Sequence, residues 1–153
     1  MDIATRRIAA NIAGALANDP SLADATGKLP RVHLDACTSS PPLDGTPFVI
    51  VSGLSAEGLR PADASHTVAV VIAIDASAVA GNAVDADRTP RGFFEFGAGD
   101  SLVRLAEAVA DRICATKAGA ILEGMDAEFS FASLPIQYCT LTLSYSELKA
   151  FGD

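Results

Sequence analysis

IQYCTLTLSYSEL, residues 136–148, alternates apolar and hydroxyl-bearing side chains along most of its length. Leu141, Leu143 and Tyr145 fall on one face of an extended chain, and the threonines and the serine between them fall on the other. Because side chains in a strand alternate with a period of two, the stretch predicts a strand with one packed face and one polar face. Nothing on it suggests catalysis, so the clearest element of the chain is architectural.

Two further stretches predict the strands around it. HTVAVVIAIDA, residues 66–76, is apolar on both faces, which favours a central strand covered on both sides. ILEGMDAEFSFASL, residues 121–134, is typical of a long strand with Phe129 and Phe131 on one face. Pro135 then leads a turn into the last strand, so these last two strands are expected to form a hairpin.

Two amphipathic helices are predicted. Ile3, Ile8, Ile12 and Leu16 recur near the helical period over residues 2–18, and Asn18-Asp19-Pro20 ends that helix and starts a short turn. A second apolar stripe at helical spacing predicts a helix that Asp100 or Ser101 caps and that runs to Lys117.

Residues 31–36 and 47–54 predict two more strands, joined by a Pro- and Gly-rich connection at 39–45 and followed by a polar loop at 55–65. The element order is therefore α-β-β-β-α-β-β. It predicts an α+β fold in which two main helices pack on a mixed or mainly antiparallel sheet of about four to five strands. At 153 residues, the chain has the usual length of a single domain, here 1–153.

Between the central strand and the second helix, the periodicity is lost over residues 78–99, a length at which loops in compact domains tend to be functional. Phe93, Phe94 and Phe96 lie near the end of this segment. Two interpretations remain open: a strand edge that places these rings in the core, or a protruding arm whose rings dock on a neighbouring subunit.

Composition limits the classes of function. The chain carries 11 basic and 19 acidic residues, a net charge of −8, and such a surface repels nucleic-acid phosphates. Cys37, Cys114 and Cys139 are widely separated and are expected to be reduced thiols in a protein core, in a cytoplasmic setting. No signal-peptide pattern or apolar run of membrane-spanning length is present, so we expect a chain that is neither secreted by that route nor bound to a membrane.

Candidate chemistry is sparse. His33 and Asp35 share a face of one predicted strand and His66 opens another, so these three could form a two-histidine, one-carboxylate metal site if the strands were adjacent; exposed histidines at strand edges are the alternative. The glycines of FGAGDSLVRL, 96–105, lack the lysine of a phosphate-binding loop, so helix capping is the better interpretation. Paired carboxylates such as Asp126 and Glu128 are typical of a solvated acidic surface. We expect no catalytic residues and no cofactor.

The order of elements nevertheless resembles the tail terminator proteins, also called tail completion or head–tail joining proteins, of tailed bacteriophages and prophage-like particles. The segments that carry the resemblance span most of the chain: IAANIAGALANDPSLADATG, PFVIVSG, TVAVVIAIDAS, DSLVRLAEAVADRICAT and FASLPIQYCTLTLSYSEL.

The resemblance implies a structural subunit, without enzymatic activity, that forms a homo-oligomeric ring, commonly a hexamer. Such a ring ends polymerisation of the tail tube protein and meets a head-completion or connector protein. DNA only passes through its lumen, and its location is the virion tail or neck, with the host bacterial cytoplasm during assembly. The connection at 39–46 and the loop at 78–99 would supply the contacts between subunits or with partners. The residues expected there are Pro41, Pro42, Leu43, Arg88, Arg91, Phe93, Phe94 and Phe96.

A second class of function stays open beside the ring subunit. The chain could be a small cytoplasmic enzyme or ligand-binding domain whose site is assembled from residues distant in sequence, such as His33, Asp35 and His66. A preformed pocket with convergent polar groups would favour that class.

Overall fold

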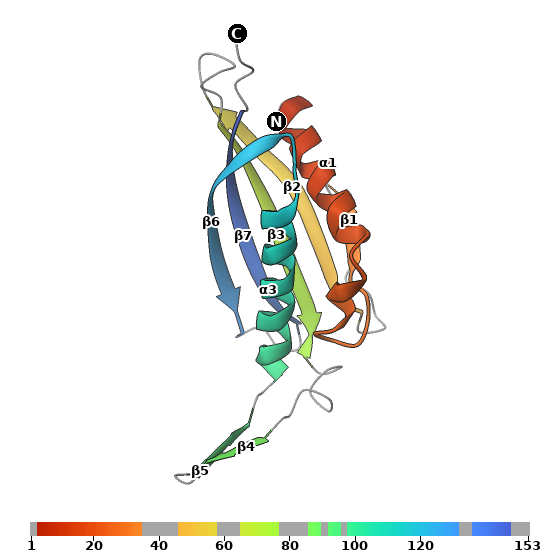
Figure 1. The fold of residues 1–153 in the computed structure, drawn as a ribbon, viewed down its shortest axis with the longest axis vertical. Helices are drawn as coiled ribbons and strands as arrows, with labels where there is room; N and C mark the ends of the chain where they lie inside the picture. The colour runs from red at the N-terminus through yellow and green to blue at the C-terminus, as the bar shows by residue number, and fades with distance from the viewer. Residues whose placement is uncertain are drawn as a thin grey trace.

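The computed structural model describes residues 3–34, 46–57, 65–76, 86–89, 92–95, 98–131 and 136–147. Two helices, α1 (Ile3–Ala17) and α3 (Ala98–Ala115), pack side by side on one face of a five-stranded sheet (Figure 1). The α+β class and the predicted order of main elements are confirmed.

The sheet is mixed, with strand order β1-β2-β3-β7-β6. Its strands are β1 (Arg31–Leu34), β2 (Phe48–Glu57), β3 (Ser65–Asp75), β7 (Ile136–Glu147) and β6 (Ala120–Ser130). β1 runs parallel to β2, and every other neighbouring pair is antiparallel. The predicted hairpin of the last two strands is confirmed as the β6–β7 pair.

The core lies between the helices and one face of the sheet. Val68, Val70 and Ile72 of β3 are fully buried, and so are Leu102 and Leu105 of α3. On the opposite face of β3, Ala69 and Val71 are only half-buried. The prediction that both faces of this strand are covered is therefore wrong along most of its length, because both helices lie on the same side. Small side chains on the second face make that exposure inexpensive.

Helix and strand ends differ slightly from the prediction. α3 begins at Ala98, so Asp100 lies in its first turn, where a carboxylate favours the helix dipole, and neither Asp100 nor Ser101 caps the helix. β2 extends to Glu57, into the segment predicted as a polar loop.

The short turn after α1 forms as a 3₁₀-helix, η1 (Pro20–Ala23), with Asp19 as its cap. The Ser21 backbone N–H donates to Asp19 Oδ1 at 3.0 Å, and the Ser21 hydroxyl donates to the same oxygen at 2.6 Å. These hydrogen bonds to the carboxylate, the hydroxyl one first, lower the pKa of Asp19. Gly27 follows with φ of 80°, a conformation that favours glycine.

Two short strands lie within the segment predicted as an irregular loop at 78–99. β4 (Ala86–Thr89) and β5 (Gly92–Glu95) pair antiparallel and form a separate two-stranded sheet. In Figure 1 this hairpin stands away from the five-stranded sheet, beyond the N-terminal end of α3.

One buried polar contact ties the start of α1 to the start of β3. A hydrogen bond joins Thr5 Oγ1 and His66 Nδ1 at 2.8 Å, and both side chains are at most 1% exposed. The contact spans 61 positions in the sequence, so it fixes the helix on the sheet at the end where β3 begins.

Replacing Thr5 by Val keeps the volume of the side chain but removes the hydroxyl from His66. We expect Thr5→Val to lower the free energy of unfolding by about 1–3 kcal/mol, since a buried polar group loses a partner. Urea denaturation followed by circular dichroism measures the change. Thr116→Val is the control, because the Thr116 hydroxyl donates to the Arg112 carbonyl on the exposed end of α3. An equal loss in both variants would contradict a special role for the buried contact.

Candidate functional site

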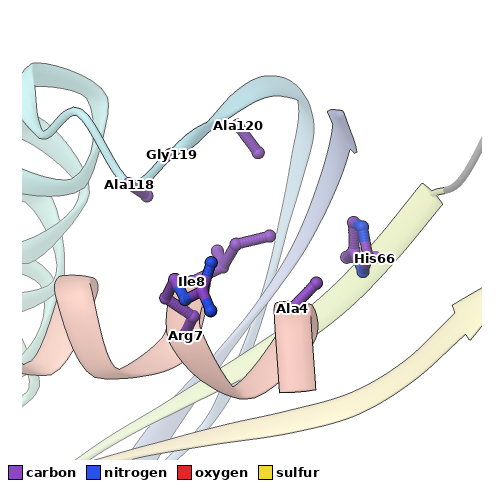
Figure 2. A pocket seen from close by; sticks show the side chains of 7 residues that line it. All are labelled: Ala4, Arg7, Ile8, His66, Ala118, Gly119 and Ala120. Carbon is purple, nitrogen blue, oxygen red and sulfur yellow. The ribbon is translucent and has the colours of Figure 1, made fainter. Parts of the chain in front are cut away.

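A small cavity opens at the end of the sheet where β3 begins. Figure 2 shows its lining: side chains from the first turns of α1, His66 of β3, and the turn that joins α3 to β6. Its volume is about 210 Å³. The lining residues are Ala4, Arg7, Ile8, His66, Ala118, Gly119 and Ala120.

The position of His66 corrects the metal-site prediction. β2 lies between β1 and β3, so the strands of His33 and His66 are not adjacent. His33 pairs with Ile50, whereas His66 pairs with Ala56, six positions further along β2. His66 is also buried and bonded to Thr5, so it is not an exposed edge histidine. Asp35 lies outside the described residues, and within them no cluster of three metal-binding side chains occurs.

A larger cavity adjoins the first, and Gly119 and Ala120 line both. Its volume is about 720 Å³. It lies between α1, the C-terminal end of α3, the α3–β6 turn and the start of β6. Its other lining residues are Asn11, Cys114, Thr116, Lys117, Leu122 and Tyr145. Gly119 has φ of 89°, and Asn11 Nδ2 donates to the Ala118 carbonyl at 2.9 Å, which holds the turn against α1.

Tyr145 is the unusual residue of the larger cavity. Its side chain is 1% exposed, and its hydroxyl has no hydrogen-bond partner among the described residues. Burial, with a smaller contribution from the neighbouring Cys114, raises the pKa of Tyr145 to about 12. The hydroxyl is therefore a neutral donor at physiological pH. The sequence pattern placed Tyr145 on the packed face of its strand but gave no sign of this unpaired group.

The cysteines meet the prediction in part. Cys139 is buried on β7, and burial raises the pKa of its thiol, as fits a core residue. Cys114 is exposed near the end of α3, so its prediction as a core thiol is wrong. Cys37 lies outside the described residues.

Only part of the predicted interface falls within the described chain. Arg88 pairs with Phe93 across the β4–β5 hairpin, and Asp87 pairs with Phe94. Their strand positions are therefore known, while the choice between core and interface for these rings stays a prediction. The remaining predicted residues, Pro41, Pro42, Leu43, Arg91 and Phe96, lie outside the described residues.

An apolar surface lies at the C-terminal end of β6. Phe129 and Phe131 are 38% and 45% exposed, and their rings stack with centroids 5.7 Å apart and planes 6° apart. Phe131 also packs on Gly99 in the first turn of α3, where a Cβ would approach its ring to 3.1 Å. The alternation of this strand did indicate a shared face for the two rings, but not that the face would stay open.

Comparison with known proteins yields no homology-based assignment. The sequence matches no protein-family model and no curated protein. Within the described residues, no helix is both long and apolar enough to cross a membrane.

Tyr145→Phe removes the unpaired hydroxyl and tests its environment. At pH 7 we expect the variant to be as stable as the original chain or more stable, because the hydroxyl has no hydrogen-bond partner within the part of the chain that the structure describes. Between pH 10 and 12 the unfolded tyrosine ionises while the folded one stays protonated, so the original chain loses up to about 3 kcal/mol of stability.

Denaturation curves of both proteins from pH 7 to 12 measure these effects. The difference between the two proteins isolates Tyr145 from Cys139, whose thiol has a raised pKa in both. A clear destabilisation of Tyr145→Phe at pH 7 would mean that the hydroxyl does have a partner.

Proposed function

We propose that the chain is a structural ring subunit that caps the tail tube of a bacteriophage or a prophage-like particle. In this role the ring stops polymerisation of the tube protein and presents a surface to the head connector. DNA passes through its lumen without being bound.

The segments that carry the sequence resemblance support this proposal. They correspond to successive elements of the fold: α1 with η1, then β2, β3, α3 and β7. The resemblance therefore involves both helices and the centre of the sheet, in their observed order.

The observation that carries the proposal is the β4–β5 hairpin. The hairpin lies between β3 and α3 in the sequence and forms a separate two-stranded sheet. In space it lies away from the body of helices and five-stranded sheet (Figure 1). An isolated two-stranded hairpin gains little stability of its own in water, so such an extension is best explained by a partner surface that it contacts. A ring subunit contacts its two neighbours through two different complementary surfaces, and a projecting hairpin would supply one of these surfaces or a contact with the tube.

Charge supports the passage of DNA. The chain has a net charge of −8, and residues 118–147 contain no lysine or arginine. A lumen of that sign would repel phosphates and allow the nucleic acid to slide.

A ligand-binding domain is the second candidate, and the larger cavity favours it. Cys114 and Lys117 bring a thiol and an amine to one concave surface of about 720 Å³, to which Leu122 adds an apolar side chain. A site of this kind would take a small molecule with an apolar body and a hydrogen-bond acceptor for the lysine.

Tube capping is tested with purified tail tube protein that polymerises in vitro. Electron microscopy measures tube lengths with and without the chain, and we expect shorter tubes that carry a ring at one end. Phe93→Ser with Phe94→Ser should abolish capping while circular dichroism shows an intact fold, if the rings form an interface. Loss of the fold would place the rings in the core instead.

Two matched measurements complete this test. Ile3→Ser replaces an exposed apolar residue at the start of α1, outside the hairpin, so its effect on tube length separates the hairpin from general loss of apolar surface. Tubes of unchanged length in the presence of the original chain would overturn the capping proposal.

A further inference from the structure

The five-stranded sheet ends in two different edges. β6 has β7 on one side and β1 has β2 on one side, and neither has a second strand neighbour within the described chain. Figure 1 places these two strands at opposite sides of the sheet. An edge strand offers a row of backbone N–H and C=O groups to another chain, so each edge is a potential pairing surface.

The two edges lie at the same level of the sheet. Residues that pair across all five strands form one row of the sheet. Phe129 pairs with Cys139, which pairs with Ile72, and the row continues through Val49 to Val32. Three neighbouring rows connect the two edges in the same way: Ala127 with Leu34, Glu128 with His33, and Ser130 with Arg31. Residues 127–130 of β6 and all of β1 therefore occupy the same four rows.

We propose that residues 127–130 of β6 pair with β1 of the next copy of this chain, antiparallel and head to tail. This inference deepens the proposed ring function and rests on it for its biological role. The strand directions give the antiparallel orientation: β1 and β7 run one way, and β3 and β6 run the other. Because the rows match, the next copy needs little shift along the strands, which suits a closed ring better than a helical filament.

The side chains on the helix-covered face are apolar at both edges. Phe129 shares this face with buried Cys139, and Val32 shares it with buried Val49. In the proposed pairing, Phe129 lies opposite Val32 of the next copy, and Ala127 lies opposite Leu34. Phe129 is 38% exposed in the single chain, so the contact removes apolar surface from water.

On the open face, an acidic side chain of one copy would meet basic side chains of the next. Glu128 would lie opposite His33 and diagonal to Arg31 of the next copy, within reach across an antiparallel ladder. Asp126 and Glu128 are both exposed, and no basic residue occurs in residues 118–147. The acidic edge of one copy thus meets the edge of the next that carries arginine and histidine.

The same charges disfavour pairing of like edges. Two β6 strands placed side by side would bring Asp126 and Glu128 of both copies together, and two β1 strands would bring the arginines together. A ladder of only four rows can hold such a ring together. When the ring closes, its last contact forms within one assembly and no longer depends on the protein concentration.

Charge reversal tests the pairing with the full-length chain alone, without tail tubes. Glu128→Lys and Arg31→Glu should each raise the concentration needed for half-assembly by at least about tenfold, measured by light scattering coupled to size exclusion. An equimolar mixture of the two variants should assemble again as alternating rings, because every contact then joins opposite charges. The double variant should also assemble.

Glu107→Lys and Arg104→Glu are the controls, because they make the same charge changes on exposed positions of α3. Circular dichroism verifies the fold of each variant. Single variants that assemble like the original chain, or a mixture that stays monomeric, would overturn the edge pairing.

A disulfide trap detects the contact even when it is transient. Ser130→Cys with Arg31→Cys, in a chain with Cys37 and Cys114 replaced by Ser, should give a ladder of cross-linked chains up to a closed ring under mild oxidation. Either new cysteine alone should give no species above a dimer. Absence of the ladder for the pair overturns the proposal.

The outcomes for the edge contact and for tube capping are independent. Rings that depend on Glu128 and Arg31 but leave tubes unchanged would support the edge pairing and contradict the capping function. Capping that survives both charge reversals would contradict the edge pairing alone.

Discussion

The fold depends on the burial of one apolar face of the sheet beneath two adjacent helices. Val68, Val70 and Ile72 of the central strand face the helices with no exposed surface, and Leu102 and Leu105 of α3 face them. Since burial of apolar area is the dominant favourable term in folding, this layer fixes the register of every strand, because a slip by one residue would expose the whole set. The exposed rings at β6 and the buried polar groups near the start of α1 both lie at the margins of this layer.

Placing both helices on one face has two consequences. The other face carries the threonines of β7 beside Ala69 and Val71 of β3, and none of these is fully buried, so this face stays accessible to solvent or to a contact. α1 covers the β1–β2 side and α3 packs against β3 and β7, which leaves the helix-side surface of β6 only partly covered, with Phe129 and Phe131 exposed. The open edge thus follows from the number of helices and from their position.

Buried polar side chains lie at the end of the sheet where α1 and β3 begin. Thr5 and His66 satisfy each other there, whereas the Tyr145 hydroxyl has no partner within the described residues. A buried unpaired donor is costly, and such groups call for a specific explanation. The ring and ligand-binding proposals give this end different roles, as a packed end of a subunit or as a pocket.

The sequence by itself determined the main helices and strands, because each has a pattern of its own: a period of 3.6 in the helices, a period of two in β7 and a continuous apolar run in β3. It did not determine β4 and β5, which lie in the segment predicted to be irregular. It also determined the hairpin of the last two strands, since their connection is short. Strand adjacency could not be read in the same way: β2 separates His33 from His66, and no local pattern reports which strands are neighbours. Burial of His66, exposure of Cys114 and the matched rows of Glu128 and His33 were decided only by tertiary structure. Each of these depends on contacts between residues far apart in the chain, which periodicity within one segment does not encode.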